Sequence, residues 1–336
     1  MTTLPTRKLG TSGPEITAVG FGAWAAGGGG WAFAWGPQDD ADSVAAIRHA
    51  VAKGVNWIDT AAVYGYGHSE VVVGRALAGI PASERPLVFT KCGLRWNDAD
   101  RMAMPVRDSR PARVREECEA SLRRLGVETI DLYQFHWPDE TGTPVEDSWG
   151  EMLRLVTDGK VRWAGVSNYD VARLEACEKI GHVQSLQPPF SMIRRGVAGA
   201  EIPWCAKHGT GVIVYSPMQS GLLTDSFTAA RAAAFAPDDW RRQSPQHQPP
   251  NLERNLALRD ALKPIAAKHG ATTAAVAVAW TLAWPGVTAA IVGARSPQQV
   301  DGWLPAATLR LDSADLAAIA AAIAKTGAGS GPTAPA

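Results

Sequence analysis

Short apolar segments alternate with helical patterns along almost the whole chain. In the helical patterns, apolar residues recur at helical spacing and the pattern ends at a glycine, as between Asp39 and Gly54. This alternation is typical of parallel strands joined by helices, and eight such units in 336 residues fit a closed (β/α)8 TIM barrel of the α/β class. An open doubly wound sheet is the structural alternative. The eight expected strands span residues 16–22, 55–58, 87–90, 130–135, 161–166, 182–186, 211–214 and 287–292.

Three segments lie outside this alternation. Thr6 to Ile16 is expected to form a short N-terminal hairpin around a Thr-Ser-Gly-Pro turn. Residues 219–251, after the seventh strand, form a long polar loop whose Trp240-Arg241-Arg242 cluster is expected to be solvated. We therefore predict a single barrel domain over residues 1–325, followed by a disordered glycine-rich and proline-containing tail over residues 326–336.

Charge and cysteine content narrow the range of partners. The chain has 33 Lys and Arg residues and 33 Asp and Glu residues, so no net field attracts nucleic acid or anionic membranes. Four scattered cysteines match neither a zinc motif nor a disulfide framework, and no metal site is predicted. No apolar segment follows the charges near the N-terminus, and Pro285-Gly286 interrupts the uncharged stretch between Gly270 and Ala294. A cytoplasmic protein with a small-molecule partner is expected.

Ionisable residues stand at the ends of three successive expected strands. These are Asp59, Lys91 and His136, and Tyr64 lies in the loop after Asp59. In a barrel the carboxyl ends of the strands form one face, so these side chains are expected to meet. An isolated tyrosine, with a pKa of about 10, is a poor acid at neutral pH, and a nearby ammonium lowers that pKa.

These residue types suit a proton donor aimed at a carbonyl group. Lys91 would supply the ammonium beside Tyr64, Asp59 would keep Lys91 charged, and His136 would orient the carbonyl oxygen. Reduction of a carbonyl also needs an electron source, for which hydride from a nicotinamide is the natural complement.

Aromatic residues surround the expected mouth of the barrel. Residues 23–37 read AWAAGGGGWAFAWGP, a loop in which glycines permit motion and aromatic side chains can close over a flat ligand. An aromatic pocket suits a hydrophobic or ring-containing carbonyl compound. The expected pocket residues are Trp24, Trp31, Trp35, Trp96 and Trp137.

The strand-end residues resemble those of the aldo-keto reductases. The motifs, in chain order, are DTAxxYG at residues 59–65, the lysine in VFTKCG, the histidine in DLYQFHWPD, GVSNY, the glutamine in SLQPPFS, YSPMQSGLL and IVGARSPQQV. The resemblance extends from Thr6 to about Ala307. It implies an enzyme that reduces an aldehyde or ketone with NADPH, or with NADH as an alternative, or that runs the reverse oxidation.

The resemblance also implies a role for each matching residue. Asp59, Tyr64, Lys91 and His136 would be a catalytic tetrad with Tyr64 as general acid. The implied cofactor contacts are Ser167, Asn168 and Gln187 at the carboxamide, Tyr215 stacked on the nicotinamide ring, Ser216, Met218, Ser220, Gly221 and Leu222 along the pyrophosphate, and Gly293, Arg295 and Gln299 at the adenosine end. Arg295 at a 2′-phosphate would favour NADPH, because a guanidinium fits phosphate geometry.

Three positions depart from the family pattern, and two functional alternatives stay open. Asp225-Ser226 stands where many relatives carry Gly-Lys, Trp303 replaces an asparagine that faces adenine, and Phe190 replaces a common tyrosine. One alternative is a cofactor-sensing regulatory protein resembling potassium-channel beta subunits. The other is a barrel hydrolase or lyase without a nicotinamide.

Overall fold

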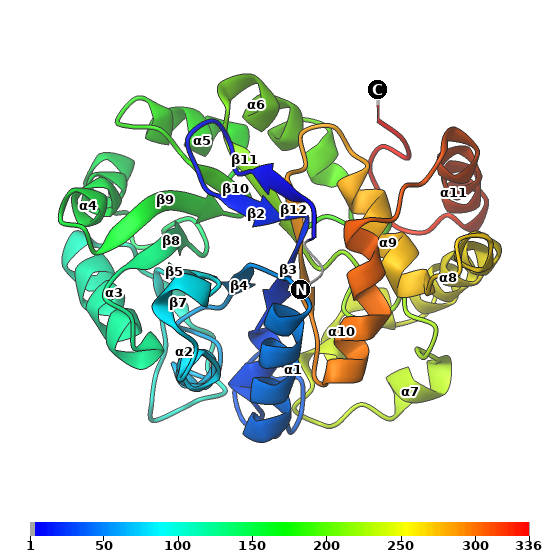
Figure 1. Ribbon diagram of the computed structural model, residues 1–336, viewed down its shortest axis with the longest axis horizontal. Helices are drawn as coiled ribbons and strands as arrows, with labels where there is room; N and C mark the ends of the chain where they lie inside the picture. Colours follow the sequence, from blue (N-terminus) through cyan, green and yellow to red (C-terminus); the bar gives the residue numbers. More distant parts are fainter. Residues whose placement is uncertain (1–3, 336) are drawn as a thin grey trace.

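Eight parallel strands close into a barrel with helices around it (Figure 1), which confirms the predicted fold. The computed structural model describes residues 4–335. Around the barrel the strands follow the order β10-β11-β12-β3-β4-β5-β8-β9. Their bounds are β3 (Val19–Gly22), β4 (Trp57–Asp59), β5 (Leu87–Cys92), β8 (Ile130–Phe135), β9 (Val161–Ser167), β10 (Ser185–Gln187), β11 (Gly211–Tyr215) and β12 (Ala289–Gly293).

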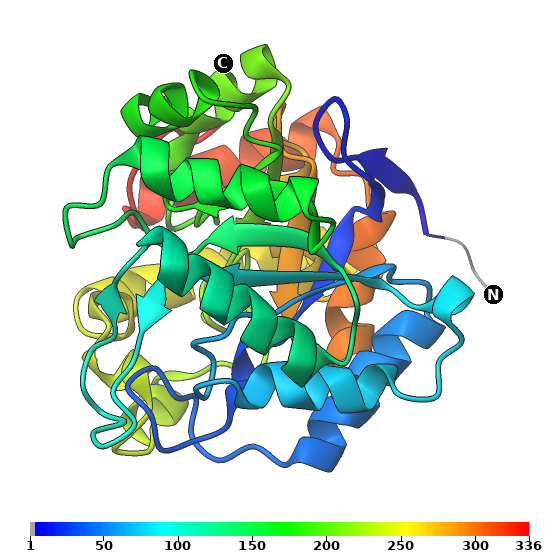
Figure 2. The ribbon, with the colours of Figure 1, turned by 90° about the vertical axis from the view of Figure 1, so that its left-hand side faces the viewer.

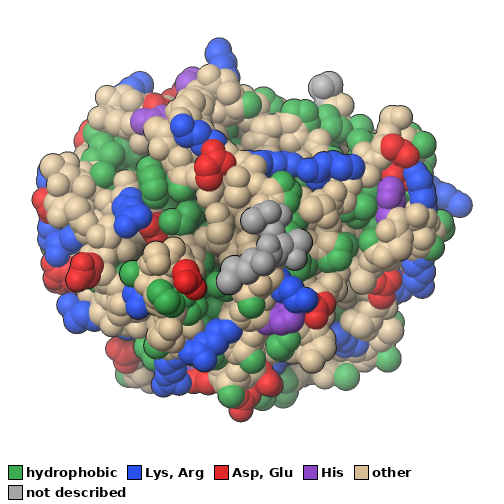
Figure 3. Space-filling view, in the orientation of Figure 1, with side chains coloured by type: hydrophobic (Ala, Val, Ile, Leu, Met, Phe, Trp, Pro, Cys, Tyr) green, Lys and Arg blue, Asp and Glu red, His purple; other side chains and the backbone are tan. Residues whose placement is uncertain are grey.

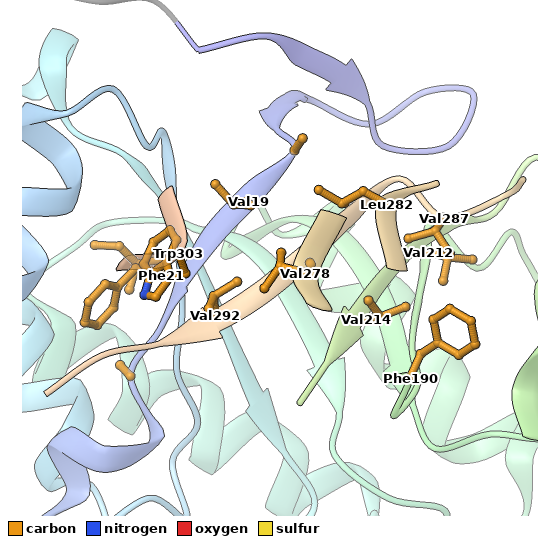
Figure 4. Packing of buried hydrophobic residues seen from close by; sticks show 14 of the residues in the cluster. Val19, Phe21, Phe190, Val212, Val214, Val278, Leu282, Val287, Val292 and Trp303 are labelled. Carbon is orange, nitrogen blue, oxygen red and sulfur yellow. The ribbon is translucent and has the colours of Figure 1, made fainter. Parts of the chain in front are cut away.

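The helices form an outer layer on the barrel. Because its strands are buried on both faces, their outward side chains pack under the helices. Val19, Phe21 and Val292 lie among Val278 and Trp303 of this layer (Figure 4). The helices are α1 (Asp40–Ala52), α2 (His68–Leu77), α3 (Pro111–Leu125), α4 (Val145–Thr157), α5 (Val171–Glu178), α6 (Glu201–His208), α7 (Ala229–Ala233), α8 (Asn251–Lys268), α9 (Thr273–Leu282), α10 (Pro297–Trp303) and α11 (Ser313–Thr326).

The barrel interior has an apolar layer below a polar one. Residues two apart on a strand point to the same side, so Trp57 and Asp59 both face inward, as do Phe89 and Lys91. Trp57 and Phe89 belong to a buried cluster together with side chains from the N-terminal hairpin. This apolar layer supports the charged residues at the carboxyl ends of the same strands.

The N-terminal hairpin is confirmed, but its second strand takes residues that were expected in the barrel. β1 (Thr6–Lys8) pairs antiparallel with β2 (Glu15–Thr17), and the barrel strand begins only at Val19. The expected strand 16–22 is therefore two elements, because Ile16 faces Arg7 across the hairpin. Figure 2 shows this hairpin and the yellow-green segment after β11 on opposite sides of the barrel.

The segment after β11 crosses the mouth of the barrel. It carries α7 and two short 3-10 turns, η4 (Trp240–Gln243) and η5 (Pro245–His247). Trp240 donates its backbone N–H to Ala34 O at 3.2 Å, which joins this segment to the glycine-rich loop after β3. We call the two segments together, residues 24–38 and 216–250, the roof of the barrel mouth.

The prediction of a disordered tail over residues 326–336 is wrong for residues 326–331, and Ala336 lies outside the described residues. Ala328 is buried, and Ser330 exchanges backbone hydrogen bonds with Ile193 and Arg195. The buried Arg195 guanidinium donates to Ala328 O and Gly331 O. The glycine and proline content of the tail predicted disorder. Composition cannot predict that the carbonyls of Ala328 and Gly331 accept hydrogen bonds from Arg195, which is far away in the sequence.

The surface shows no concentration of one charge on the face seen in Figure 3, where basic and acidic side chains are interspersed. Within residues 4–335, no helix is long and apolar enough to cross a membrane.

Candidate active site

A cavity of about 640 Å³ opens at the carboxyl ends of the strands, under the roof. Most of the residues singled out from the sequence line it. They are Asp59, Tyr64, His136, Ser167, Asn168, Gln187, Tyr215, Ser216, Met218, Ser220, Gly221, Gly293, Arg295 and Gln299, with Trp24, Trp31, Trp35 and Trp137. In the described part of the chain, no group of three or more His, Cys, Asp or Glu residues is placed to hold a metal ion.

Asp59 lines the bottom of the cavity and forms a buried ion pair with Lys91 beneath it. Lys91 Nζ lies 2.5 Å from Asp59 Oδ1 and donates a second hydrogen bond to Thr60 O at 2.8 Å. Gln187 Nε2 donates to the other Asp59 oxygen at 2.8 Å. Burial raises the pKa of Asp59 and lowers the pKa of Lys91, while the attraction between the two charges opposes both shifts. The pair fixes an ammonium group directly beneath the cavity.

Tyr64 and His136 lie above this pair. Lys91 Nζ is 5.2 Å from the centre of the Tyr64 ring, and the His136 ring meets Tyr64 edge-on at 5.5 Å. Burial, and then the charge of Asp59, raise the pKa of Tyr64 well above its usual value. Burial, and then the charge of Lys91, lower the pKa of His136 well below its usual value. At neutral pH the site therefore presents a protonated phenol and a neutral imidazole.

The expected lowering of the Tyr64 pKa is thus wrong for this structure. Lys91 is the expected nearby ammonium, but its charge is paired with Asp59. Burying a phenolate is costly, and the charge of Asp59 and then that of Tyr215 add to this cost, so the pKa of Tyr64 rises.

Polar side chains from β9, β10 and β11 connect into a network beside Tyr64 and His136. Ser167 Oγ donates to Gln187 O at 2.7 Å, and Asn168 Nδ2 donates to His136 O at 2.9 Å. Tyr215 donates its hydroxyl to Asn168 Oδ1 at 2.9 Å. Asn168 has a φ of 62° and Ser216 a φ of 56°, a left-handed backbone conformation that is uncommon for non-glycine residues.

Comparison with known proteins gives the family. The Aldo/keto reductase family model matches residues 18–324. The chain belongs to this family. The NADH-specific methylglyoxal reductase of Escherichia coli strain K12 is 32% identical over 316 residues, which cover 91% of this chain and 94% of that protein. Aldo-keto reductases are oxidoreductases that reduce carbonyl groups with NADH or NADPH, and this chain is such an enzyme in general terms.

Solved structures of aldo-keto reductases are also similar to this chain. The glycerol dehydrogenase AKR11B4 of Gluconobacter oxydans has a TM-score of 0.86 and 38% identity, with 98% of each chain covered. An aldo/keto reductase from Klebsiella pneumoniae, in complex with NADP and acetate, has a TM-score of 0.68 and 27% identity, with 94% of each chain covered.

One side of this aldo-keto reductase's cavity concentrates positive charge. Arg231 and Arg241 come from the roof segment after β11, and Arg295 follows β12. Burial, and then the charges of Arg241 and Arg231, lower the pKa of Arg295. Arg241 is buried and pairs with Asp239, so the prediction that it is solvated is wrong. Its charge could not be placed from sequence because the cluster lies in an irregular polar segment.

Arg295 is not free in the cavity. Its guanidinium donates to Gln38 Oε1 at 2.5 Å and to backbone carbonyls of Trp35 and Pro37, all in the glycine-rich part of the roof. Gln299 accepts the backbone N–H of Arg295 at 2.9 Å. Residues at the adenosine end of the expected cofactor site therefore also hold the roof.

The departures from the family pattern have structural explanations. Asp225 accepts the backbone N–H of Thr273 at 3.0 Å, at the start of α9. Phe190 stacks on Trp280 in the core and does not line the cavity, whereas Trp303 does. Asp225 thus stabilises the start of a helix and supplies no cation for a phosphate.

Three of the singled-out residues do not line the cavity. Lys91 lies beneath Asp59, and Leu222 is fully buried. Trp96 stacks on Tyr66 at 5.2 Å, so its assignment to the pocket wall is wrong. The wall includes Phe33 of the glycine-rich loop, whose aromatic residues were expected near a ligand, and also Val63, Leu94, Met104, Pro105 and Arg107, which were not predicted to line it. Met104 and Pro105 lie in a loop without a recognisable motif, and Leu94 and Arg107 lie in the short strands β6 (Leu94–Arg95) and β7 (Val106–Arg107).

Proposed function

We propose that this aldo-keto reductase reduces an aldehyde or ketone to an alcohol, or oxidises the alcohol in reverse, with Tyr64 as the proton donor. The observation that carries the proposal is the placement of Tyr64. Its phenol lines the cavity beside the neutral His136, with the Lys91–Asp59 pair behind it. A protonated phenol in this position is a general acid for a carbonyl oxygen.

The residues around the cavity suit NADPH, with NADH as an alternative. Arg231, Arg241 and Arg295 provide positive charge for phosphate groups on one side. Ser167, Asn168 and Gln187 provide amide and hydroxyl groups for a carboxamide, and Tyr215 provides a ring surface. The bound cofactor would supply the hydride, or accept it in the reverse direction.

Each tetrad residue then has a physical task. His136 is neutral, so a ring N–H can donate a hydrogen bond to the carbonyl oxygen and hold that oxygen near Tyr64. Tyr64 gives up its proton as the oxygen becomes basic, and the Lys91 ammonium near its ring stabilises the phenolate that forms. Asp59 keeps that ammonium in place. Trp24, Trp31, Trp35 and Trp137 would enclose a hydrophobic or ring-containing substrate.

Removal of the Tyr64 hydroxyl tests the proposal. Tyr64→Phe is expected to lower kcat by about 10² to 10⁴, the usual size of general acid catalysis, while NADPH still quenches tryptophan fluorescence. Tyr66→Phe is the matched control, because the Tyr66 hydroxyl donates to Arg101 O, a residue that does not line the cavity. Full activity of Tyr64→Phe would exclude Tyr64 as the proton donor.

A panel of carbonyl compounds tests the reaction itself. Tight NADPH binding without turnover of any aldehyde or ketone would favour the cofactor-sensing role of a protein resembling potassium-channel beta subunits. Absence of any quenching by NADPH would favour a barrel enzyme without a nicotinamide.

A further inference from the structure

Positive charge reaches the cavity from two opposite sides. Arg231, Arg241 and Arg295 follow β11 and β12, whereas Arg107 ends β7 (Val106–Arg107), in the segment after β5. In the closed order of eight strands, β5 stands four positions from β11 in either direction, directly across the barrel. Arg107 is therefore separate from the three arginines that the proposed function assigns to cofactor phosphates.

Arg107 is held next to the reacting centre. Its guanidinium carbon lies 4.5 Å from the centre of the Trp137 ring, and Trp137 directly follows His136. The backbone of Arg107 pairs with Leu94 of β6 (Leu94–Arg95) in a short antiparallel ladder. Stacking on an indole fixes the plane of a guanidinium while leaving its N–H edge available.

The donors of Arg107 are not used within the protein. Among residues 4–335, no acceptor takes a hydrogen bond from its guanidinium. Glu140 is the closest acid, at 3.9 Å between Nε and Oε2, and its other oxygen accepts the backbone N–H of Arg107 at 3.0 Å. The Arg107 guanidinium has five N–H donors, and Glu140, which is distant and half-exposed, is the one carboxylate near them in the described chain. The guanidinium can therefore bind a second acidic group.

Among the described residues, the cavity wall beside Arg107 holds no second lysine or arginine. The neighbouring wall of the cavity is apolar, with Leu94, Met104 and Pro105. The two carboxylates that line the cavity are engaged elsewhere, Asp59 with Lys91 and Asp225 with the start of α9. Arg107 is thus a single cation on an apolar and aromatic wall. Such a wall suits a ligand whose body is apolar and whose one end carries an acidic group.

We propose that Arg107 binds a carboxylate of the substrate, and that the preferred substrates are aromatic or otherwise ring-bearing carbonyl compounds that carry a carboxylate. This inference rests on the proposed carbonyl reduction. The carbonyl oxygen lies at Tyr64 and His136, the ring lies against the aromatic wall, and the carboxylate reaches the guanidinium beside Trp137. Because Arg107 stacks on the residue next to His136, the two polar groups of the substrate are separated by about one ring.

Two probe substrates separate the charge from the rest of the molecule. 4-Carboxybenzaldehyde carries the carboxylate, and methyl 4-formylbenzoate replaces it with a neutral ester of similar shape. The quantity measured is the ratio of kcat/KM for the acid to kcat/KM for the ester. Arg107→Ala is expected to lower this ratio by about tenfold or more, the usual effect of losing a charge-assisted hydrogen bond. Arg107→Lys should keep part of the preference.

Glu140→Gln tests the same idea in the opposite direction. This change removes the negative charge beside Arg107, so the ratio should rise above that of the wild type. Added salt should lower the ratio for the wild type but not for Arg107→Ala. Quenching of tryptophan fluorescence by NADPH shows that each variant is folded.

The failures of the two proposals can be told apart. If the wild type reduces the ester but Arg107→Ala and Glu140→Gln leave the ratio unchanged, carbonyl reduction stands and the carboxylate site is excluded. Equal losses for acid and ester in Arg107→Ala would also exclude it, because Arg107 would then act only on the shape of the wall. If the wild type reduces no carbonyl compound at all, both proposals fall.

Discussion

Glu117 is a buried acid behind the strand that carries Lys91. It lies on α3, its Oε2 accepts the backbone N–H of Gly93 at 2.9 Å, and its Oε1 has no partner in the described residues. Burial raises the pKa of Glu117 from 4.5 to about 7. Because the folded-state pKa is the higher one, the stabilisation from the protonated form is complete below pH 4.5 and is lost as the pH rises through 7.

Glu117→Gln should therefore change how stability depends on pH. The glutamine keeps an acceptor for Gly93 but cannot ionise, so the variant avoids burying a negative charge. We expect the free energy of unfolding of the variant, relative to the wild type, to increase by up to about 3 kcal/mol between pH 5 and pH 8. Urea unfolding of both proteins at the two pH values measures this difference. Parallel pH curves would show that Glu117 is already ionised in the folded protein.

At the scale of elements, the roof is coupled to the catalytic loop through stacked rings. Trp24 of η1 (Trp24–Gly27) stacks on Tyr64 at 5.9 Å and on Trp240 of η4 at 5.4 Å. Trp35 meets both tryptophans edge-on. The position of Tyr64 thus depends on a residue far along the chain that does not itself line the cavity.

Trp240→Ala should shift the position of Tyr64 although Trp240 acts on Tyr64 only through Trp24. Loss of one ring lets Trp24 and the loop shift, and small displacements of a catalytic group are costly, so kcat is expected to fall by about tenfold or more. Trp240→Phe, which keeps a ring, should retain most activity. Trp96→Ala is the control, because Trp96 also stacks on a tyrosine but lies outside the cavity. Equal effects of the two alanine variants would argue against the coupling.

The same elements show what could be predicted from the sequence. Asp59, Lys91 and His136 were found because parallel strands end on one face, so their proximity follows from the fold alone. Trp96 was misplaced because the segment after β5 folds into a hairpin that turns it onto Tyr66. The burial of Arg241 was not predicted because it depends on Trp35, far away in the sequence, whose ring lies against the guanidinium only in the folded roof. Regular elements follow from local pattern, whereas irregular loops depend on contacts between distant residues.

At the scale of the whole molecule, the C-terminal segment joins the outer helices to the carboxyl ends of the strands. α11 packs on α8, and the residues after it run to the loop that follows β10. There Arg195 is buried, with 3% of its surface exposed, and within residues 4–335 all hydrogen bonds of its guanidinium go to backbone carbonyls. Its charge is satisfied by carbonyl oxygens, including Ala328 O at 3.1 Å and Gly331 O at 3.2 Å. Because a buried cation is costly without hydrogen-bond acceptors, any change that removes these carbonyls should lower the stability of the fold.

Deletion of residues 328–336 should therefore destabilise the protein through Arg195. The loss of two acceptors for a buried cation is expected to lower the free energy of unfolding by about 1–3 kcal/mol, measured by urea unfolding. Arg195→Met in the shortened chain should recover part of this loss, because an apolar side chain of similar length needs no acceptors. If the deletion alone leaves the unfolding midpoint unchanged, the segment contributes no stability. If Arg195→Met lowers stability further in the shortened chain, the loss comes from packing of Ala328 and not from the unsatisfied charge.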